Sequence, residues 1–211
     1  MKDIYTILSN IKSLKTSLYE GLLRGQQSTI DDGDEAVYVL IEEFLKENYL
    51  GKWIISDKPN KDGLYEVSSN ESVKVTNMKI TSLTNDLFIW TSVKGHFGCP
   101  YCKELKSLEG APKEVESSFI CPYCNSLKTL KGAPKHVSDF SCRYCKSLES
   151  LEGAPEKVNG DFDCELCPSL ESLEGAPKKV GDRFICSGSK KQFTEEDVMK
   201  LVGVNRNKIY V

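Results

Sequence analysis

Apolar residues recur in a fixed frame between residues 97 and 186. The chain repeats the pattern F-x-C-x-x-C-x-x-L-x-x-L-x-G-A-P-x-x-V four times, and a fifth copy stops after FICSGS. Polar residues that change from copy to copy fill the positions between these letters. The phenylalanines that open the copies lie 22, 21, 22 and 22 residues apart, at Phe97, Phe119, Phe140, Phe162 and Phe184. A fixed period of this length predicts a solenoid, in which stacked copies share one apolar core.

The repeated letters also predict the course of one coil. In F-x-C the two constant residues are separated by one, which is the alternation of a short strand with one inward face. Strands of successive copies are then expected to form a parallel ladder at about 4.8 Å spacing. Gly-Ala-Pro is expected to form the corner, because Gly permits unusual backbone angles and Pro prevents a helix from continuing. The predicted inward set is Phe, both Cys, both Leu, Ala and Val.

The segment before the repeats predicts two helices and a hairpin. Apolar residues at helical spacing indicate a first helix from Ile4 to about Leu23 and, after a linker over residues 25–33, a second from Asp34 to about Gly51. The turn-rich stretch DKPNKDG then lies between two strand-like runs, which predicts a β-hairpin that covers the first coil.

The other flank predicts a C-terminal cap, in which Thr194 begins a short helix and a last strand follows. The predicted fold class is therefore an α/β repeat: a short solenoid of about five coils with a cap at each end. The predicted segments are a helical segment (residues 1–51), a hairpin cap (52–72), the solenoid (73–189) and a C-terminal cap (190–211).

The repeated string resembles a known family. F-x-C-x-x-C-x-x-L-x-x-L is similar to the leucine-rich-repeat segment L-x-L-x-x-(N/C)-x-L-x-x-L, with Phe97 and Cys99 in the strand leucine positions and Cys102 in the Asn/Cys position. The motif SLEGAPKxV with paired cysteines, C-terminal to the segments KPNKDGLYEVSS and ITSLTNDLFIW, also resembles leucine-rich-repeat proteins of tailed bacteriophages. This resemblance implies a solenoid fold and a phage origin, but no assigned chemistry.

Charge and composition exclude some functions. The net charge is −3 with 28 Lys+Arg against 31 Asp+Glu, so the basic excess typical of nucleic-acid-binding surfaces is missing and nucleic acid is an unlikely partner. The N-terminus does not have the apolar run of a secretory signal, and no stretch is apolar enough to span a membrane. The expected location is a reducing cytoplasm, the host cytosol if the chain is phage-encoded.

The nine cysteines allow two interpretations. We favour buried structural thiols and no cofactor, because cysteine behaves as a small apolar residue and the pattern continues into lone Cys186. The alternative is zinc, since the CxxC pairs have the spacing of tetrahedral Cys₄ sites. Zinc would take two sets of ligands: Cys99, Cys102, Cys121 and Cys124, and Cys142, Cys145, Cys164 and Cys167.

The outward-facing positions of the strands are the candidate contact surface for a protein partner. A column of large side chains follows the strands, and stacked aromatic residues provide rigid contact area at small entropic cost. An acidic trio beside it is a candidate contact for a basic partner. The candidate partner-binding residues are Tyr101, Tyr123, Tyr144, Leu166, Ile120, Arg143, Asp161, Asp163 and Glu165.

No paired catalytic carboxylates, phosphate-binding loop or nucleophile–base pair stands out in the sequence, so we do not expect an enzyme. The favoured function is a non-enzymatic protein–protein interaction module, an accessory protein of a bacteriophage that binds a host or phage protein. The alternatives are a zinc-binding cysteine-repeat protein that contacts nucleic acid, and a structural virion or assembly component. The sequence leaves the oligomeric state open.

Overall fold

The computed structural model describes residues 30–76 and 79–211, and the first predicted helix lies outside these residues. The chain divides into two compact units, Met1–Lys46 and Glu47–Val211. Helix α2 (Ile30–Asn48) begins at Ile30, before the predicted Asp34, so its first turn replaces the end of the predicted linker. In the described residues no helix has the length and apolarity needed to cross a membrane.

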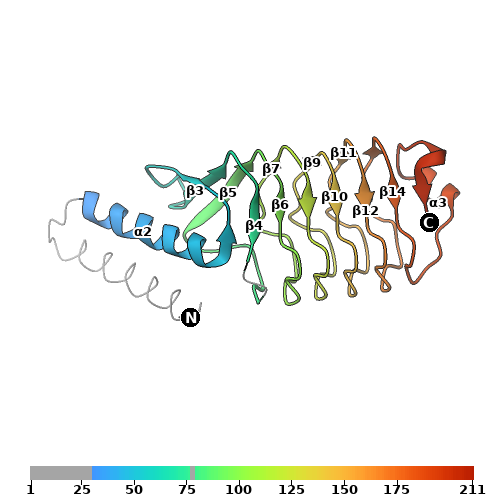
Figure 1. The fold of residues 1–211 in the computed structure, drawn as a ribbon, viewed down its shortest axis with the longest axis horizontal. Coiled ribbons are helices and arrows are strands. Elements are labelled where there is room, and N and C mark those ends of the chain that lie inside the picture. Colours follow the sequence, from blue (N-terminus) through green and yellow to red (C-terminus); the bar gives the residue numbers. More distant parts are fainter. Residues whose placement is uncertain (1–29, 77–78) are drawn as a thin grey trace. The chain divides into compact units, whose positions relative to one another are not determined.

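The second unit is a parallel-strand β-solenoid of about seven turns (Figure 1). We call its largest sheet the ladder sheet. The strand order of the ladder sheet is β1 (Tyr49–Leu50), β4 (Val73–Val75), β6 (Phe97–Gly98), β8 (Phe119–Ile120), β10 (Phe140–Ser141), β12 (Phe162–Asp163), β14 (Phe184–Ile185) and β15 (Ile209–Tyr210). All neighbours from β4 to β15 are parallel and each phenylalanine lies in register with the next, as the repeat predicts.

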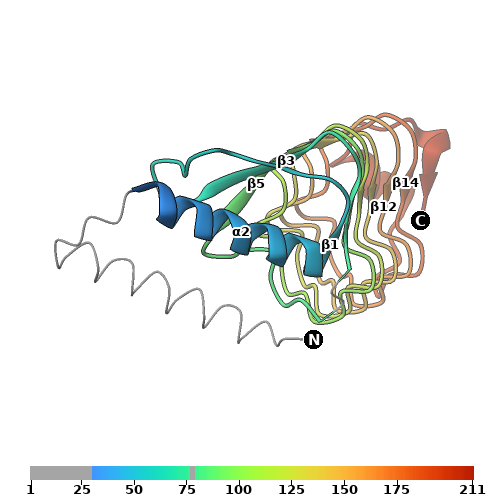
Figure 2. The ribbon, with the colours of Figure 1, turned by 60° about the vertical axis from the view of Figure 1, so that its left-hand side comes forward.

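Each coil returns through a second strand, and Figure 2 shows the coils stacked behind one another. One return sheet has the order β2 (Ile54–Ile55), β3 (Tyr65–Ser69), β5 (Phe88–Val93) and β7 (Glu114–Val115). The other has the order β13 (Lys179–Val180), β11 (Lys157–Val158) and β9 (His136–Val137). The described coils between β6 and β14 therefore consist of strands and turns, and the few helices lie outside them.

The expected number of coils was too small, about five against about seven. Val73 lies in register with Phe97 and Ile209 with Phe184, so the terminal turns continue the ladder with other apolar residues in the phenylalanine position. The hairpin strands β2 and β3 are antiparallel, but β3 also pairs in parallel with β5 and so belongs to a return sheet. At the other end Thr194 caps the five-residue helix α3 (Glu195–Met199), and a 3-10 turn, η1 (Arg206–Lys208), precedes β15.

The interior consists of columns of identical side chains. All five repeat phenylalanines are fully buried, and successive rings stack with centroids 5.3 to 5.5 Å apart. The cysteines and leucines of the repeat are buried beside them. The corner differs from the prediction in one respect, because the proline of Gly-Ala-Pro is buried in every copy, whereas only Ala111 among the alanines is buried.

The corner glycine is required by close packing of successive coils. Gly132 has φ +94°, and a Cβ atom at this residue would lie 2.3 Å from the backbone nitrogen of Glu109 in the preceding coil. Left-handed backbone and the absence of space for a side chain both favour glycine here. The coils can therefore approach closely enough to form continuous columns.

Candidate partner-binding face

The column of large side chains predicted beside the strands is formed by the structure, on an unusual backbone. We call Tyr101, Tyr123 and Tyr144 the tyrosine column, and Leu166 continues it. Their φ angles are 61°, 61°, 59° and 56°, in the left-handed region that bulky residues rarely adopt. Gly188 occupies the same position in the truncated fifth copy with φ 73°, so the turn is a property of the coil.

Backbone hydrogen bonds hold the tyrosine column in register. The N–H of Tyr101 donates to the carbonyl of Pro122, and the N–H of Tyr123 donates to that of Arg143, both at 2.9 Å. The rings of Tyr101 and Tyr123 stack at 4.7 Å with 6° between their planes, and those of Tyr123 and Tyr144 at 4.5 Å with 3°. Tyr101 is 47% exposed. Desolvation by its surroundings, followed by the neighbouring tyrosines, raises the pKa of Tyr123.

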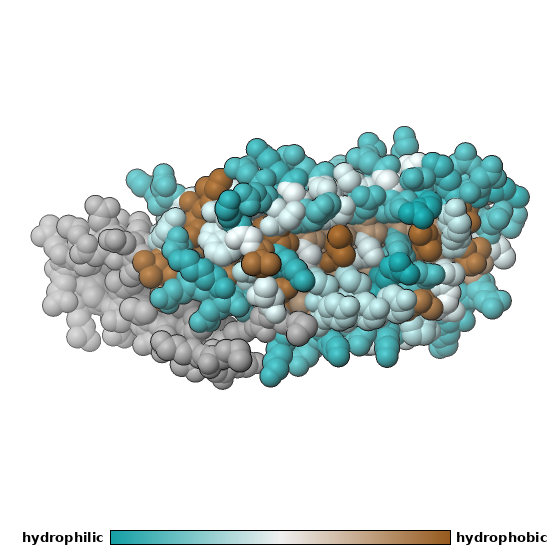
Figure 3. Space-filling model, viewed as in Figure 1, coloured by the Kyte–Doolittle hydropathy of each residue, from teal (hydrophilic) through white to brown (hydrophobic). Residues whose placement is uncertain are grey.

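Strands β6 and β8 present an uncharged surface next to the tyrosine column, beside Lys74 of β4, and we call this surface the uncharged half of the ladder sheet. Its outward residues there are Gly98 and Pro100 on one coil and Ile120 and Pro122 on the next, with Ile120 37% exposed. Figure 3 shows apolar side chains spaced along the strand ladder between polar margins. Tyrosine, proline and isoleucine together give this half a rigid surface that water solvates poorly.

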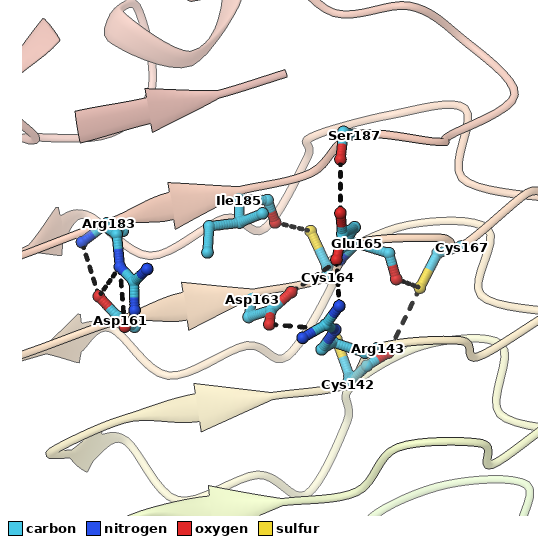
Figure 4. A network of polar contacts seen from close by, with 10 residues as sticks. All are labelled: Cys142, Arg143, Asp161, Asp163, Cys164, Glu165, Cys167, Arg183, Ile185 and Ser187. Carbon is cyan, nitrogen blue, oxygen red and sulfur yellow. Dashed lines mark hydrogen bonds and ion pairs between the residues drawn. The ribbon is translucent and has the colours of Figure 1, made fainter. Parts of the chain in front are cut away.

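The other half of the ladder sheet carries charges that pair between coils (Figure 4). Asp161 and Arg183 form a bidentate ion pair, and its hydrogen bonds lower the pKa of Asp161. Arg143 contacts Glu165, and its Nε lies 3.4 Å from Asp163 Oδ2. Burial raises the pKa of Asp163. Each carboxylate of the predicted acidic trio therefore has a guanidinium partner within the chain.

The cysteines form two buried columns, and none of the nine is in a disulfide. In a regular parallel ladder the carbonyl of Cys99 would accept the N–H of residue 122, but residue 122 is proline and has no N–H. The thiol of Cys124 donates to this carbonyl instead, at 3.1 Å. The thiol contact also occurs where the ladder residue is not proline: Cys145 donates to the carbonyl of Cys121 at 3.3 Å, and Cys167 donates to that of Cys142.

These contacts keep most of the thiols neutral. Hydrogen bonding with Cys99 alone would lower the pKa of Cys121, but burial and the neighbouring thiols raise it to about 12. Cys102 differs, because hydrogen bonding with Cys124 lowers its pKa. In the part of the chain that the structure describes, no three or more His, Cys, Asp or Glu side chains are grouped to hold a metal ion, so the two predicted Cys₄ sets are not assembled.

No protein-family model, curated protein or solved structure matches this chain. The sequence reasoning missed the left-handed backbone of the tyrosine column, although Gly188 at the equivalent position was a signal for it. It also treated the acidic trio as a separate patch. Arg143 and Glu165 stand 22 residues apart, one repeat period, which was a signal that they lie on neighbouring coils.

Proposed function

We propose that this protein is a non-enzymatic protein–protein interaction module, a leucine-rich-repeat-like accessory protein of a bacteriophage that acts in the host cytosol. The tyrosine column, Leu166 and the uncharged half of the ladder sheet are its contact surface. The assignment to phages rests on the sequence resemblance. The assignment of the surface rests on one observation, the partly exposed tyrosines held on left-handed backbone.

The energetics of the tyrosine column support a role in recognition. A left-handed residue that is not glycine costs about 1–2 kcal/mol. A stacked aromatic pair returns about 0.5–1.5 kcal/mol, and the three tyrosines form two such pairs. The stacking therefore offsets the backbone cost only in part, and burial of the partly exposed rings must supply the rest or the strain remains. Backbone strain of this kind concentrates at functional sites.

The chemistry of the surface also suits a protein partner. Tyrosine is enriched at the centres of protein interfaces, where a rigid ring contributes area and the hydroxyl contributes a hydrogen bond. The ring spacing is fixed by the coils, so the rings lose little freedom on binding.

The test uses a variant that removes the rings without straining the coil. The variant combines Tyr101→Gly, Tyr123→Gly and Tyr144→Gly. Glycine is chosen because Gly188 already occupies the equivalent position of the fifth copy with positive φ. The tagged chain and this variant are used for affinity capture from infected host extract, followed by mass spectrometry. We expect a partner retained by the parent chain to be reduced at least tenfold with the variant, while circular dichroism stays the same.

The matched control variant combines Lys128→Gln and Lys131→Gln in the coil of Tyr123. Both lysines are exposed and form ion pairs with the next coil. This control is expected to retain the partner. Equal capture by all three proteins would contradict the proposed surface, and abundant chain in purified virions would contradict the accessory role.

A further inference from the structure

A surface depression of about 650 Å³ lies at the C-terminal end of the ladder sheet, beyond the tyrosine column. Ile185 of β14 and Ser187 just after it line the depression between the preceding coil, with Asp163 and Glu165, and strand β15. Figure 4 shows Ile185 between the Asp161–Arg183 pair and the group around Glu165. The lining residues are Arg143, Asp163, Glu165, Arg183, Ile185, Ser187, Glu195, Ile209, Tyr210 and Val211.

The charged groups around the depression compensate one another. Asp161 accepts from both the backbone N–H and the guanidinium of Arg183. Glu165 accepts from Arg143 and, at 3.1 Å, from the hydroxyl of Ser187. Glu195 at the rim lies 3.6 Å from the guanidinium of Arg206. The network thus fixes many donors and acceptors in place without presenting one strong sign of charge.

One polar atom in this network has no hydrogen-bond partner. The Nε of Arg143 is shielded from bulk solvent and makes no hydrogen bond. The nearest carboxylate oxygen of Asp163, 3.4 Å away, contacts it as an ion pair only. The side chains themselves remain partly exposed, Arg143 by 40%, Asp163 by 14% and Glu165 by 28%, so a ligand in the depression can reach their other polar atoms.

The depression also has apolar lining residues, which require an apolar face on the ligand. Ile185 and Tyr210 both line it, and Tyr210 on β15 is 50% exposed. A ligand must then combine several hydroxyl groups with an apolar face that can lie against a tyrosine ring. An ammonium group would have to compete with the two lining guanidinium groups, and an anion would meet the three lining carboxylates, Asp163, Glu165 and Glu195.

We propose that this depression binds a neutral sugar residue. Its ring lies against Tyr210 and Ile185, and its hydroxyls exchange hydrogen bonds with Arg143, Asp163 and Glu165. Hydroxyl groups act as both donor and acceptor, so they suit a network in which both kinds of atom alternate. Small-ligand sites of this kind combine apolar walls with a few fixed polar groups.

The test records amide spectra of the full chain during titration with glucose, galactose, mannose and N-acetylglucosamine, and in parallel with agmatine and acetate as charged probes. An array of immobilised glycans extends the choice of sugars. We expect at least one neutral sugar to shift the amides of Ile185, Ser187 and Tyr210 saturably. Tyr210→Ser should weaken this binding at least tenfold, whereas Tyr101→Gly, in the turn after β6 and outside the depression, should leave it unchanged.

Ser187→Ala provides a second variant that leaves the ion pairs intact, and it should also weaken the sugar. The proposal is overturned if no sugar or array glycan binds, or if agmatine or acetate binds in place of sugars. Equal sugar binding by the parent chain and Tyr210→Ser would overturn it too. The tyrosine-column variants separate this proposal from the proposed protein interaction.

Discussion

Two columns of stacked aromatic rings run through the same coils, and they differ in almost every other respect. The phenylalanines lie in strands, are fully buried and stack at 5.3 to 5.5 Å. The tyrosines lie on left-handed backbone, are partly exposed and stack at 4.5 to 4.7 Å. Both columns therefore stack from coil to coil, but only the phenylalanines are fully buried and only the tyrosines have strained backbone.

The difference separates the part of a coil that stabilises the fold from the part that is free to serve recognition. Burying a phenylalanine removes a large apolar area from water, and the strand that carries it is unstrained. A half-exposed tyrosine gains less from burial and has a backbone cost to offset. Substitutions in the two columns should therefore have effects of different size.

The largest effect is expected for Phe140→Ala, which leaves a cavity in the middle of the buried column. Such a change should lower the free energy of unfolding by about 3–5 kcal/mol. The matched change in the same coil, Tyr144→Ala, loses one stacked pair and should cost about 0.5–1.5 kcal/mol. Urea unfolding monitored by circular dichroism measures both. Similar costs for the two changes would contradict the division between the columns.

A smaller effect is expected in the cysteine columns, where the thiol supplies a hydrogen bond that the backbone lacks. Cys124→Val keeps an apolar side chain but leaves the buried carbonyl of Cys99 without its donor, which should cost about 1–3 kcal/mol. Cys124→Ser retains a donor and should restore part of this loss. If valine were as stable as cysteine in urea unfolding, the thiols would be apolar filling alone.

The stacked interior was the most predictable feature of the molecule. The period and the constant apolar residues predict the parallel register, because only in-register stacking buries each repeat phenylalanine against the next, as Phe97 against Phe119. The number of turns was less predictable. Val73 and Ile209 continue the ladder with few repeat residues around them, Val93 in register with Val115 being one, so the terminal turns are marked mainly by apolarity.

The candidate site was predictable by position but not by conformation. Side-chain type placed Tyr101 in an exposed column, yet nothing about tyrosine predicts positive φ, which the course of the coil imposes between the two cysteines. The cross-coil pairing of Arg143 with Glu165 depends on register, which had to be known before the charges could be matched. The hydrogen bonds of the thiols depend on atomic positions that no spacing rule provides.

The smallest effect, and the sharpest test of the strained backbone, compares two small residues at one position. At Tyr101 both Gly and Ala remove the ring, but only Ala keeps a Cβ atom at φ 61°, so Tyr101→Gly should be the more stable by about 1–2 kcal/mol. At Ile120, a strand residue of the next coil, the order should reverse, with Ala more stable than Gly by about 0.5–1 kcal/mol. Urea unfolding of the four variants measures both differences. If Ala were the better residue at both positions, left-handed strain would not distinguish the tyrosine column from the strands, and the argument that its rings are retained for recognition would lose its basis.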